Sequence, residues 1–355
     1  MALKTDWSWD TVNLQFRQYI FSLMVEFLMS TPQKIFVTGA NGFIGRAISQ
    51  RFLQMGIPVV GVDLQANPAL NVHAGNVAQA GDWQRLAKGC DLVIHTAAVV
   101  SNTATAELYR QVSVGSVRHV INAAIHGDAS RVMHLSSIAS YGLDFNRTRT
   151  ETDDICLLSG HPYCDAKAAS EHAALAAHAA GEMACTVIRP GDVYGPGSRP
   201  WVLIPLDLIQ KNQFLLPMQG RGVFSPVYID NLLDGIVAAA IHNQAAGQIY
   251  NLTDGVDVTC LDFFAHHWRW AGKRGKPVCL PTSLAQGLTK GSEWLLRHVL
   301  QQYTEISSSS LAMLTRRAGY SIAKAKQQLG YQPQIDLATG MQRTEDWLRQ
   351  QQLIG

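Results

Sequence analysis

Tyr163 and Lys167 stand four residues apart at the start of an alanine-rich stretch with strong helix propensity. Four residues make about one helical turn, so both side chains project from the same face of the predicted helix. A neighbouring ammonium group favours the phenolate, and we therefore expect Lys167 to lower the pKa of Tyr163 from its ordinary value of about 10. Tyr163 is then a candidate general acid or base. The same spacing also occurs by chance on surface helices, so it needs support from elsewhere in the chain.

A predicted strand that ends in serines supports this pair. Residues 131–136 are typical of a buried strand, and Ser137 follows directly. Ligands of parallel α/β sheets bind beyond the carboxyl ends of the strands, so Ser137 is placed to hydrogen-bond a substrate oxygen. Ser136 and Ser140 are competitors for this role, and we interpret them as residues that cap or orient the loop.

A glycine-rich turn lies between the first predicted strand and the first predicted helix. Gly39, Gly42 and Gly45 permit a tight turn, close approach of a pyrophosphate, and packing of the helix on the strand. Asp63 ends the next strand, where a carboxylate can accept hydrogen bonds from both ribose hydroxyls and repel a 2′-phosphate. The pattern predicts a dinucleotide site that prefers NAD to NADP, although Arg46 is a reason for caution. The alternatives are glycines that serve only the turn and an ordinary strand-end aspartate.

The histidines of the chain are weaker candidates for functional residues. His95 ends another predicted strand, before small residues that leave room for a cofactor ribose, and we interpret it as structural. His266 and His267 are adjacent, so they point apart on a helix or strand, and no carboxylate partner is placed beside them. We therefore expect no metal site.

Strands and helices alternate along most of the chain, which predicts a doubly wound parallel α/β sheet of the Rossmann type with a smaller C-terminal lobe. The three predicted parts are an extension of uncertain role (1–29), a dinucleotide-binding domain (30–195), and a mainly substrate-binding lobe (196–355) from which some segments return to the sheet. The predicted strands are 34–38, 59–63, 91–97, 131–136 and 186–189, and the predicted helices are 46–54, 106–124 and 166–180.

Composition excludes several classes of protein. The chain has 355 residues, of which 47% are apolar, and its net charge is +2 with both signs mixed, unlike a nucleic-acid binder. The six cysteines are scattered without CxxC spacing, which favours a reduced, cytoplasmic protein. The apolar stretch 19–27 is short and interrupted by Glu26. Residues 1–28 could be an amphipathic helix on the body or a membrane, a dimer element, or an extension upstream of a start at Met29.

Together these motifs resemble the extended short-chain dehydrogenase/reductase family, also known as the NAD-dependent epimerase/dehydratase superfamily, from about Lys34 to Leu353. Further stretches are similar to family signatures: Arg189 to Gly197, Val227 to Asn231, Ile249 to Leu252 and Leu329 to Pro333. The resemblance implies an NAD-dependent enzyme acting on CH–OH groups, and often a homodimer. In this family Tyr163 would exchange a proton with the substrate oxygen, Lys167 would hold the nicotinamide ribose, and Ser137 would orient the carbonyl.

The resemblance also implies a set of residues around the cofactor. These are Gly39, Asn41, Gly42, Phe43, Ile44, Gly45, Asp63, Asn76, Val77, Thr96, Ala97, Ala98, Lys167, Pro190 and Val193. Two of the family's polar positions differ here. Ser113 stands where an asparagine usually supports the lysine, and Asn76 replaces an aspartate near the adenine. Both changes keep polar character, so we expect activity to be retained.

The substrate branch depends on the residues after Pro190. Nucleotide-sugar enzymes of the family usually have an asparagine after the Arg-Pro pair and an arginine at the position of Phe224, whereas this chain has Gly191 and Asp192. The run from Trp201 to Leu216 is also rich in large apolar residues, about half of which we assign to the core. The residue pattern of this region most resembles the 3β-hydroxysteroid dehydrogenase-like branch, which predicts a steroid- or lipid-like alcohol or ketone as the substrate. Nucleotide-sugar epimerisation and NAD binding without turnover stay open as alternatives.

Overall fold

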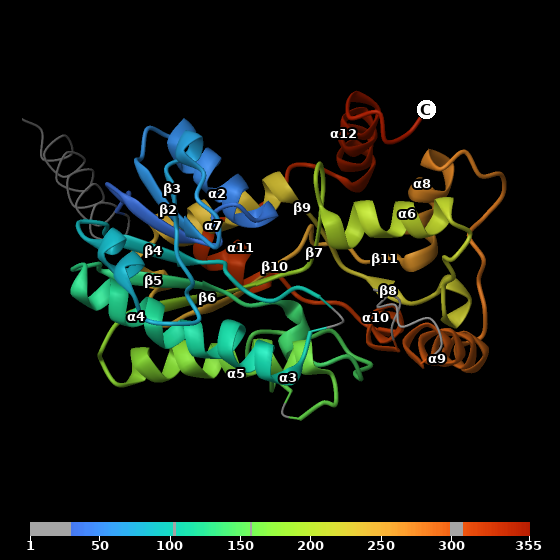
Figure 1. Ribbon diagram of the computed structural model, residues 1–355, viewed down its shortest axis with the longest axis horizontal. Helices are drawn as coiled ribbons and strands as arrows, with labels where there is room; N and C mark the ends of the chain where they lie inside the picture. Colours follow the sequence, from blue (N-terminus) through green and yellow to red (C-terminus); the bar gives the residue numbers. More distant parts are fainter. Residues whose placement is uncertain (1–29, 102–103, 157, 299–307) are drawn as a thin grey trace, which may run out of the picture.

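The computed structural model describes residues 30–101, 104–156, 158–298 and 308–355. The extension predicted for residues 1–29 lies outside the described residues. The described chain forms a central sheet with helices on both faces, and a smaller group of helices at one end (Figure 1).

Seven parallel strands make the central sheet, in the order β10-β6-β5-β4-β1-β2-β3. The change of direction after β1 is the switch point at which doubly wound sheets bind ligands. The predicted Rossmann-type sheet is therefore confirmed, and the second strand has the predicted bounds. The strands are β1 (Ile35–Thr38), β2 (Val59–Asp63), β3 (Val72–Ala74), β4 (Leu92–His95), β5 (Arg131–Leu135), β6 (Ala184–Pro190) and β10 (Ile249–Leu252).

Alternate residues of the strands point to two separate cores. Ile35 and Val37 of β1 belong to the core beneath α2 (Phe43–Gln54), α7 (Ile229–Ile241) and α11 (Ala323–Leu329). Phe36, between them, belongs to the core beneath α4 (Ser116–His126) and α5 (Pro162–Ala179). Both faces of the sheet are thus covered, as a parallel sheet requires.

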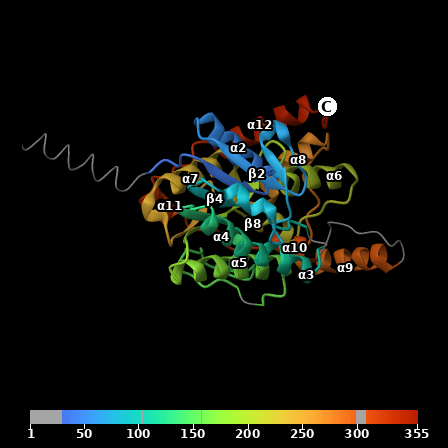
Figure 2. The same ribbon diagram turned by 60° about the vertical axis from the view of Figure 1, so that its left-hand side comes forward.

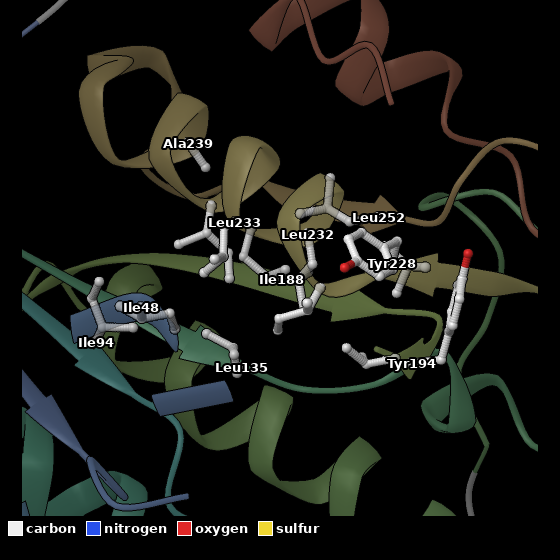
Figure 3. Close-up of a cluster of buried hydrophobic side chains, with 14 of the residues drawn as sticks. Ile48, Ile94, Leu135, Ile188, Tyr194, Tyr228, Leu232, Leu233, Ala239 and Leu252 are labelled. Atoms are coloured by element: carbon white, nitrogen blue, oxygen red, sulfur yellow. The ribbon is translucent and has the colours of Figure 1, made fainter. Parts of the chain in front are cut away.

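The core beneath α7 joins late segments of the chain to the early sheet. Leu232 and Leu233 of α7 face Leu135 of β5 and Ile188 of β6 (Figure 3). The strand β10 also pairs with β6, with Tyr250 beside Ile188. Segments beyond residue 195 therefore complete the sheet that holds the glycine turn and the serine strand end.

The remaining late elements gather at one end of the sheet, on the right of Figure 1. Figure 2 shows α9 extending from this end beside α10. Two short strand pairs, β7 with β9 and β8 with β11, form separate two-stranded sheets. The elements are β7 (Asp192–Tyr194), α6 (Ile204–Gln210), β8 (Val223–Phe224), β9 (Pro226–Tyr228), β11 (Val258–Thr259), α8 (Cys260–Trp270), α9 (Thr282–His298), α10 (Ser308–Met313) and α12 (Leu337–Gln350).

All three predicted helices differ from their predicted bounds. The helix predicted at 166–180 is α5, which begins at Pro162 and ends at Ala179. The helix predicted at 46–54 begins at Phe43, because the last residues of the glycine turn already form its first turn. The helix predicted at 106–124 is interrupted: α3 (Ala106–Leu108) runs into a π-helical segment, Tyr109–Gly115, before α4. Such π-helical turns are rare and frequently lie at functional sites.

Candidate active site

One cavity of about 1070 Å3 brings the predicted site residues together. Its wall includes the glycine turn, the residues after β4 and β5, and the start of α5, and it continues to α6, α9 and α10. The predicted residues that line it are Gly39, Gly42, Phe43, Ile44, Gly45, Asp63, Asn76, Val77, Thr96, Ala97, Ala98, Ser137, Tyr163, Lys167, Pro190 and Val193. Asn41 is the exception, because its side-chain amide donates to the carbonyl of Gln65 at 2.7 Å and holds the loop after β2.

The glycine turn has the close packing that a dinucleotide cradle requires. Gly39 has φ +71°, which favours glycine, and a Cβ on Gly45 would lie 2.2 Å from the carbonyl oxygen of Gly39. These contacts bring the N-terminus of α2 against β1, so its free N–H groups and positive dipole end face the cavity wall. The turn therefore fits the pyrophosphate of NAD.

Asp63 fits the adenosine end of the same cofactor. Its Oδ2 accepts a hydrogen bond from the main-chain N–H of Asn41 at 2.9 Å, and its Oδ1 accepts from the N–H of Leu64 at 2.7 Å. The carboxylate is thus fixed at the cavity wall, at the carboxyl end of β2. A fixed carboxylate can accept further hydrogen bonds from ribose hydroxyls, since each of its oxygens has two lone pairs.

Tyr163 lines the cavity from the first turn of α5, and its ring packs edge-on against Tyr109 of the π-helical segment with ring centres 6.3 Å apart. Burial raises the pKa of Tyr163 above 10, although a hydrogen bond with Ser137 opposes the shift. The prediction that Lys167 lowers this pKa was wrong for this structure. Burial removes more hydration free energy from the Tyr163 phenolate than the hydrogen bonds of neighbouring groups restore.

Lys167 is buried, one turn beyond Tyr163. Its Nζ donates to the carbonyl oxygen of Leu135, at the end of β5, over 2.9 Å. Burial lowers the pKa of Lys167 to about 8, and the carboxylate of Glu171 opposes this shift. The ammonium group is therefore held by a main-chain acceptor, and its charge depends on pH near neutrality.

Ser137 occupies the turn between β5 and a short 3₁₀ helix, Ile138–Tyr141. Its Oγ accepts a hydrogen bond from the N–H of Ala139 at 3.1 Å, which fixes the hydroxyl beside the cavity. The hydroxyl of Ser136 donates instead to Glu171 on α5. This contact confirms that Ser136 orients the loop, while the fully buried hydroxyl of Ser140 has no hydrogen-bond partner among the described residues.

A buried ion pair lies beneath the catalytic candidates. Arg189 of β6 donates to Glu171 through Nε at 3.0 Å and Nη2 at 2.6 Å. Its guanidinium also lies over the ring of Tyr141, 4.4 Å from the ring centre. The pair links α5, β6 and the serine strand end, because Glu171 also accepts the Ser136 hydroxyl.

The prediction that His95 is structural is confirmed by its contacts. Its Nδ1 lies 2.7 Å from Oγ1 of Thr38, and its Nε2 lies 2.9 Å from Oγ of Ser116. Burial, with the nearby charge of Lys167, lowers the pKa of His95 to about 3. A neutral ring with both nitrogens occupied has no free group to offer a substrate.

The two positions that depart from the family pattern have local partners. Ser113 is buried in the π-helical segment, and its Oγ accepts from the N–H of Val99 at 3.2 Å. Asn76 accepts from the N–H of Ala78 at 3.0 Å and lines the cavity. Both side chains therefore shape the loops around the cavity.

The apolar run after Gly197 divides between the cavity and the core. Trp201, Ile204, Leu208, Phe214 and Leu215 line the cavity. The other half, including Leu216, is not part of the cavity wall, which agrees with the prediction that about half of the run is core.

Phe224, which stands where nucleotide-sugar enzymes usually have an arginine, is not at the cavity wall. It is fully buried, with its ring centre 4.0 Å from that of Phe263 and 4.9 Å from that of Trp201. The short strand β8 turns this side chain into the aromatic core of the C-terminal lobe. Phe224 therefore affects substrate choice only because this position carries no cationic side chain that could bind a phosphate.

Sequence reasoning did not bring Asp192 and Arg316 together as site residues. Both line the cavity, and they form a buried ion pair. The sequence held one partial signal, since Asp192 stands where nucleotide-sugar enzymes usually have an asparagine. Nothing in the sequence paired it with an arginine 124 residues later.

The fold and cavity define a Rossmann-type, dinucleotide-dependent enzyme. The chain belongs to the NAD dependent epimerase/dehydratase family, whose sequence profile matches residues 35–253. NAD is therefore the cofactor, and the residues described above fit it.

Curated relatives extend over most of the chain. A 4-hydroxy-2-methyl-3-oxo-4-farnesyl-3,4-dihydroquinoline-1-oxide ketoreductase from Stigmatella aurantiaca is 26% identical, over 89% of this chain and 96% of the relative. The decarboxylating sterol-4-alpha-carboxylate 3-dehydrogenase of Candida albicans is 23% identical, over 90% and 98%. A 3-beta-hydroxysteroid dehydrogenase from Mycolicibacterium neoaurum is 24% identical, over 84% and 87%. These relatives confirm the predicted resemblance to the 3β-hydroxysteroid dehydrogenase-like branch, and the predicted class of enzyme acting on CH–OH groups.

Solved structures share the fold. MoeE5, solved in complex with UDP-glucose and NAD, has a TM-score of 0.71 at 21% identity, over 90% of this chain and 99% of that protein. A UDP-glucuronic acid 4-epimerase from Bacillus cereus, solved with NAD, has a TM-score of 0.70 at 22% identity, over the same shares. At these identities the likeness concerns the fold alone.

No helix among the described residues is both long and apolar enough to cross a membrane.

Proposed function

We propose that this chain interconverts a hydrophobic, steroid- or lipid-like secondary alcohol and its ketone, with NAD as the hydride carrier. The observation that carries the proposal is a single cavity that joins the glycine turn, the group Ser137, Tyr163 and Lys167, and an apolar wall. In this proposal residues 30–195 mainly hold the cofactor, and residues 196–355 mainly hold the substrate.

Each catalytic candidate has a role that its contacts support. When bound, NADH supplies the hydride that reduces the carbonyl carbon. Tyr163 donates its phenolic proton to the carbonyl oxygen, and its raised pKa keeps that proton in place at neutral pH. Ser137 donates a second hydrogen bond to the same oxygen, and together the two hydroxyls stabilise the developing alkoxide. Lys167 supports the nicotinamide ribose.

The apolar wall supports a hydrophobic substrate. Five large side chains of the run after Gly197 line the cavity, joined by residues of α9 and α10. Each Å2 of apolar surface that the substrate buries there contributes about 25 cal/mol. The curated relatives named above act on sterols, steroids or a farnesylated ring, according to their names.

The cavity wall has few cationic side chains to compensate the negative charge of a nucleotide sugar. Among the described lining residues the cationic ones are Lys167, Arg199 and Arg316. Lys167 lies with the catalytic candidates, and the charge of Arg316 is offset by Asp192. A diphosphate needs cationic or main-chain donors to compensate its charge, and burying it without them costs several kcal/mol.

Nucleotide-sugar epimerisation is the second candidate. The exposed Arg199 at the cavity wall favours it, as do the neighbours solved with UDP-sugars. The glycine turn and the Tyr163–Lys167 pair are common to both branches and do not discriminate between them.

Calorimetric titration of the NAD-loaded protein separates these candidates. We expect a 3-keto steroid to bind and UDP to give no heat, and NADH absorbance to fall when the steroid is added to the NADH form. Tight UDP binding without a response to the steroid would overturn the proposal in favour of the sugar-nucleotide branch. If the cofactor binds, but no ketone oxidises bound NADH and no alcohol reduces bound NAD, the non-catalytic alternative is favoured.

A further inference from the structure

Asp192 and Arg316 place a buried pair of opposite charges in the cavity wall. Asp192 begins β7, directly after the strand that carries Arg189, and Arg316 follows α10. Their side chains are 7% and 3% exposed. Since both residues line the cavity, the little exposure that they keep faces the ligand space.

The two oxygens of Asp192 differ in their contacts. Its Oδ2 accepts hydrogen bonds from the N–H of Ser225, at 3.1 Å, and from the guanidinium of Arg316. Its Oδ1 accepts no hydrogen bond from any described residue, yet it is not sealed from the cavity. A nearly buried carboxylate oxygen without a partner is costly, because it has lost water and gained no donor in return.

Tyr163 lines the same cavity as this carboxylate. The charge of Asp192 is among the causes that raise the pKa of Tyr163. A substrate whose oxygen meets the Tyr163 hydroxyl therefore shares one cavity with Asp192.

We propose that Asp192 binds a hydrogen-bond-donating substituent of the substrate, a hydroxyl or an amine, on a carbon adjacent to the reacting carbon. This inference rests on the proposed function, and it adds a specific polar group to an otherwise apolar ligand. The Oδ1 atom supplies the acceptor. Burial raises the pKa of Asp192, and the charge of Arg316 opposes that rise.

The same pair disfavours an anionic substituent. The guanidinium of Arg316 is engaged by Asp192 and by the carbonyl of Met313, to which its Nε donates at 3.1 Å. A carboxylate at this point would meet the negative charge of Asp192, and a methoxyl group would leave Oδ1 unpaired. Sites built around a buried acceptor reject analogues that lack the donor more strongly than apolar pockets reject a shape change.

A series of saturated 3-keto steroids tests this inference. Its members carry hydrogen, hydroxyl, methoxyl or carboxylate on the carbon next to the ketone. The dissociation constant of each is measured by calorimetry on the NAD-loaded protein, and kcat/KM is measured separately with NADH. We expect the hydroxyl compound to bind at least about tenfold more tightly than the methoxyl compound, and the carboxylate to bind most weakly.

Variants assign the preference to Asp192. Asp192→Ala should reduce the hydroxyl-to-methoxyl ratio to about one. Because that change leaves Arg316 buried without its partner, Asp192→Leu combined with Arg316→Met removes both charges and should show the same loss in a folded protein. Asp257→Asn is the matched control. Asp257 accepts from the Ser225 hydroxyl at 2.6 Å but is not part of the cavity wall, so the preference should persist.

Two outcomes would overturn the inference while the proposed function stands: equal binding of the hydroxyl and methoxyl compounds, or tightest binding of the carboxylate, which would make Arg316 the ligand contact. A different result marks failure of the proposed function itself. In that case the unsubstituted steroid neither binds nor is reduced, and the inference falls with it.

Discussion

The guanidinium of Arg189 and the carboxylate of Glu171 form a buried ion pair, with Nη2 and Oε2 2.6 Å apart and both side chains at most 2% exposed. The pair fixes the distance between α5, which carries Tyr163 and Lys167, and the sheet. It also receives the hydroxyl of Ser136, next to Ser137. The relative position of the three catalytic candidates thus depends on two charges that do not reach the cavity.

Removing one charge of this pair should therefore destabilise the protein strongly. We expect Glu171→Ala to lower the free energy of unfolding by about 3–5 kcal/mol, because it leaves Arg189 charged and unpaired in the core. Urea denaturation followed by circular dichroism measures the change. The matched control is Glu107→Ala, which breaks the exposed pair with Arg110 and should change the free energy of unfolding much less. Equal losses in the two variants would contradict the assigned role of the buried pair.

Tyr163→Phe should lower kcat by roughly 10²–10⁴ and leave NADH affinity nearly unchanged, since only the hydroxyl group that donates the proton is removed. Steady-state turnover of the ketone and fluorescence titration with NADH separate the two effects. Tyr250→Phe is the control: Tyr250 is buried and its hydroxyl donates to Gln328, away from the cavity. Near-normal turnover in Tyr163→Phe would remove Tyr163 from the mechanism.

Cofactor affinity should depend on pH through Lys167. Burial lowers the pKa of Lys167 to about 8, so its ammonium charge is present below that pH and is lost as the pH rises through it. We expect the dissociation constant for NADH to increase between about pH 7 and about pH 9. The nearby His95 and His134 do not contribute, because burial lowers the pKa of His95 to about 3 and that of His134 well below its usual range.

Lys167→Met is the test of this assignment. The variant should bind NADH weakly and with no pH dependence over the same range, as fluorescence titration would measure. A dependence that survives in Lys167→Met would assign the titration to another group.

The sequence predicted those parts of the site whose residues lie close together along the chain. The glycine turn, the strand-end Asp63 and the Tyr163–Lys167 pair each lie within a few residues of one element, so periodicity and spacing place them. The alternation of strands and helices likewise predicts the doubly wound sheet, because each βαβ unit is itself local.

What the sequence could not predict depends on contacts between distant segments. Arg316 reaches Asp192 only because the chain returns to the cavity after α10. The sequence also did not show that Phe224, at the position of the family's arginine, packs against Phe263 in the core. The sign of the Tyr163 pKa shift was also wrong, because the shift is set by burial, which one helical turn of sequence does not reveal.

Asp63 should set the choice between the two nicotinamide cofactors. NADH should bind more tightly than NADPH, because a 2′-phosphate would meet the fixed carboxylate. Asp63→Ala should narrow the gap between the two dissociation constants. Asp63→Asn removes the charge and keeps the size of the side chain, but its single amide oxygen can accept from only one of the N–H groups of Asn41 and Leu64. A wild-type preference for NADPH would contradict this assignment.

Alanine substitutions in three glycines should give a graded response that reports on the cofactor cradle. A Cβ on Gly45 would lie 2.2 Å from the Gly39 carbonyl oxygen, one on Gly42 would lie 3.1 Å from it, and one on Gly287 in α9 would meet nothing within 4 Å. Gly45→Ala must therefore push α2 away from β1, and we expect large losses of both NADH affinity and thermal stability. Gly42→Ala should lose affinity with little change in stability, since its neighbour needs to move only slightly. Gly287→Ala should keep its affinity and gain up to about 1 kcal/mol from helix propensity. Thermal denaturation with and without NADH measures all three variants, and a Gly45→Ala protein with wild-type NADH affinity would show that the turn is only a packing element.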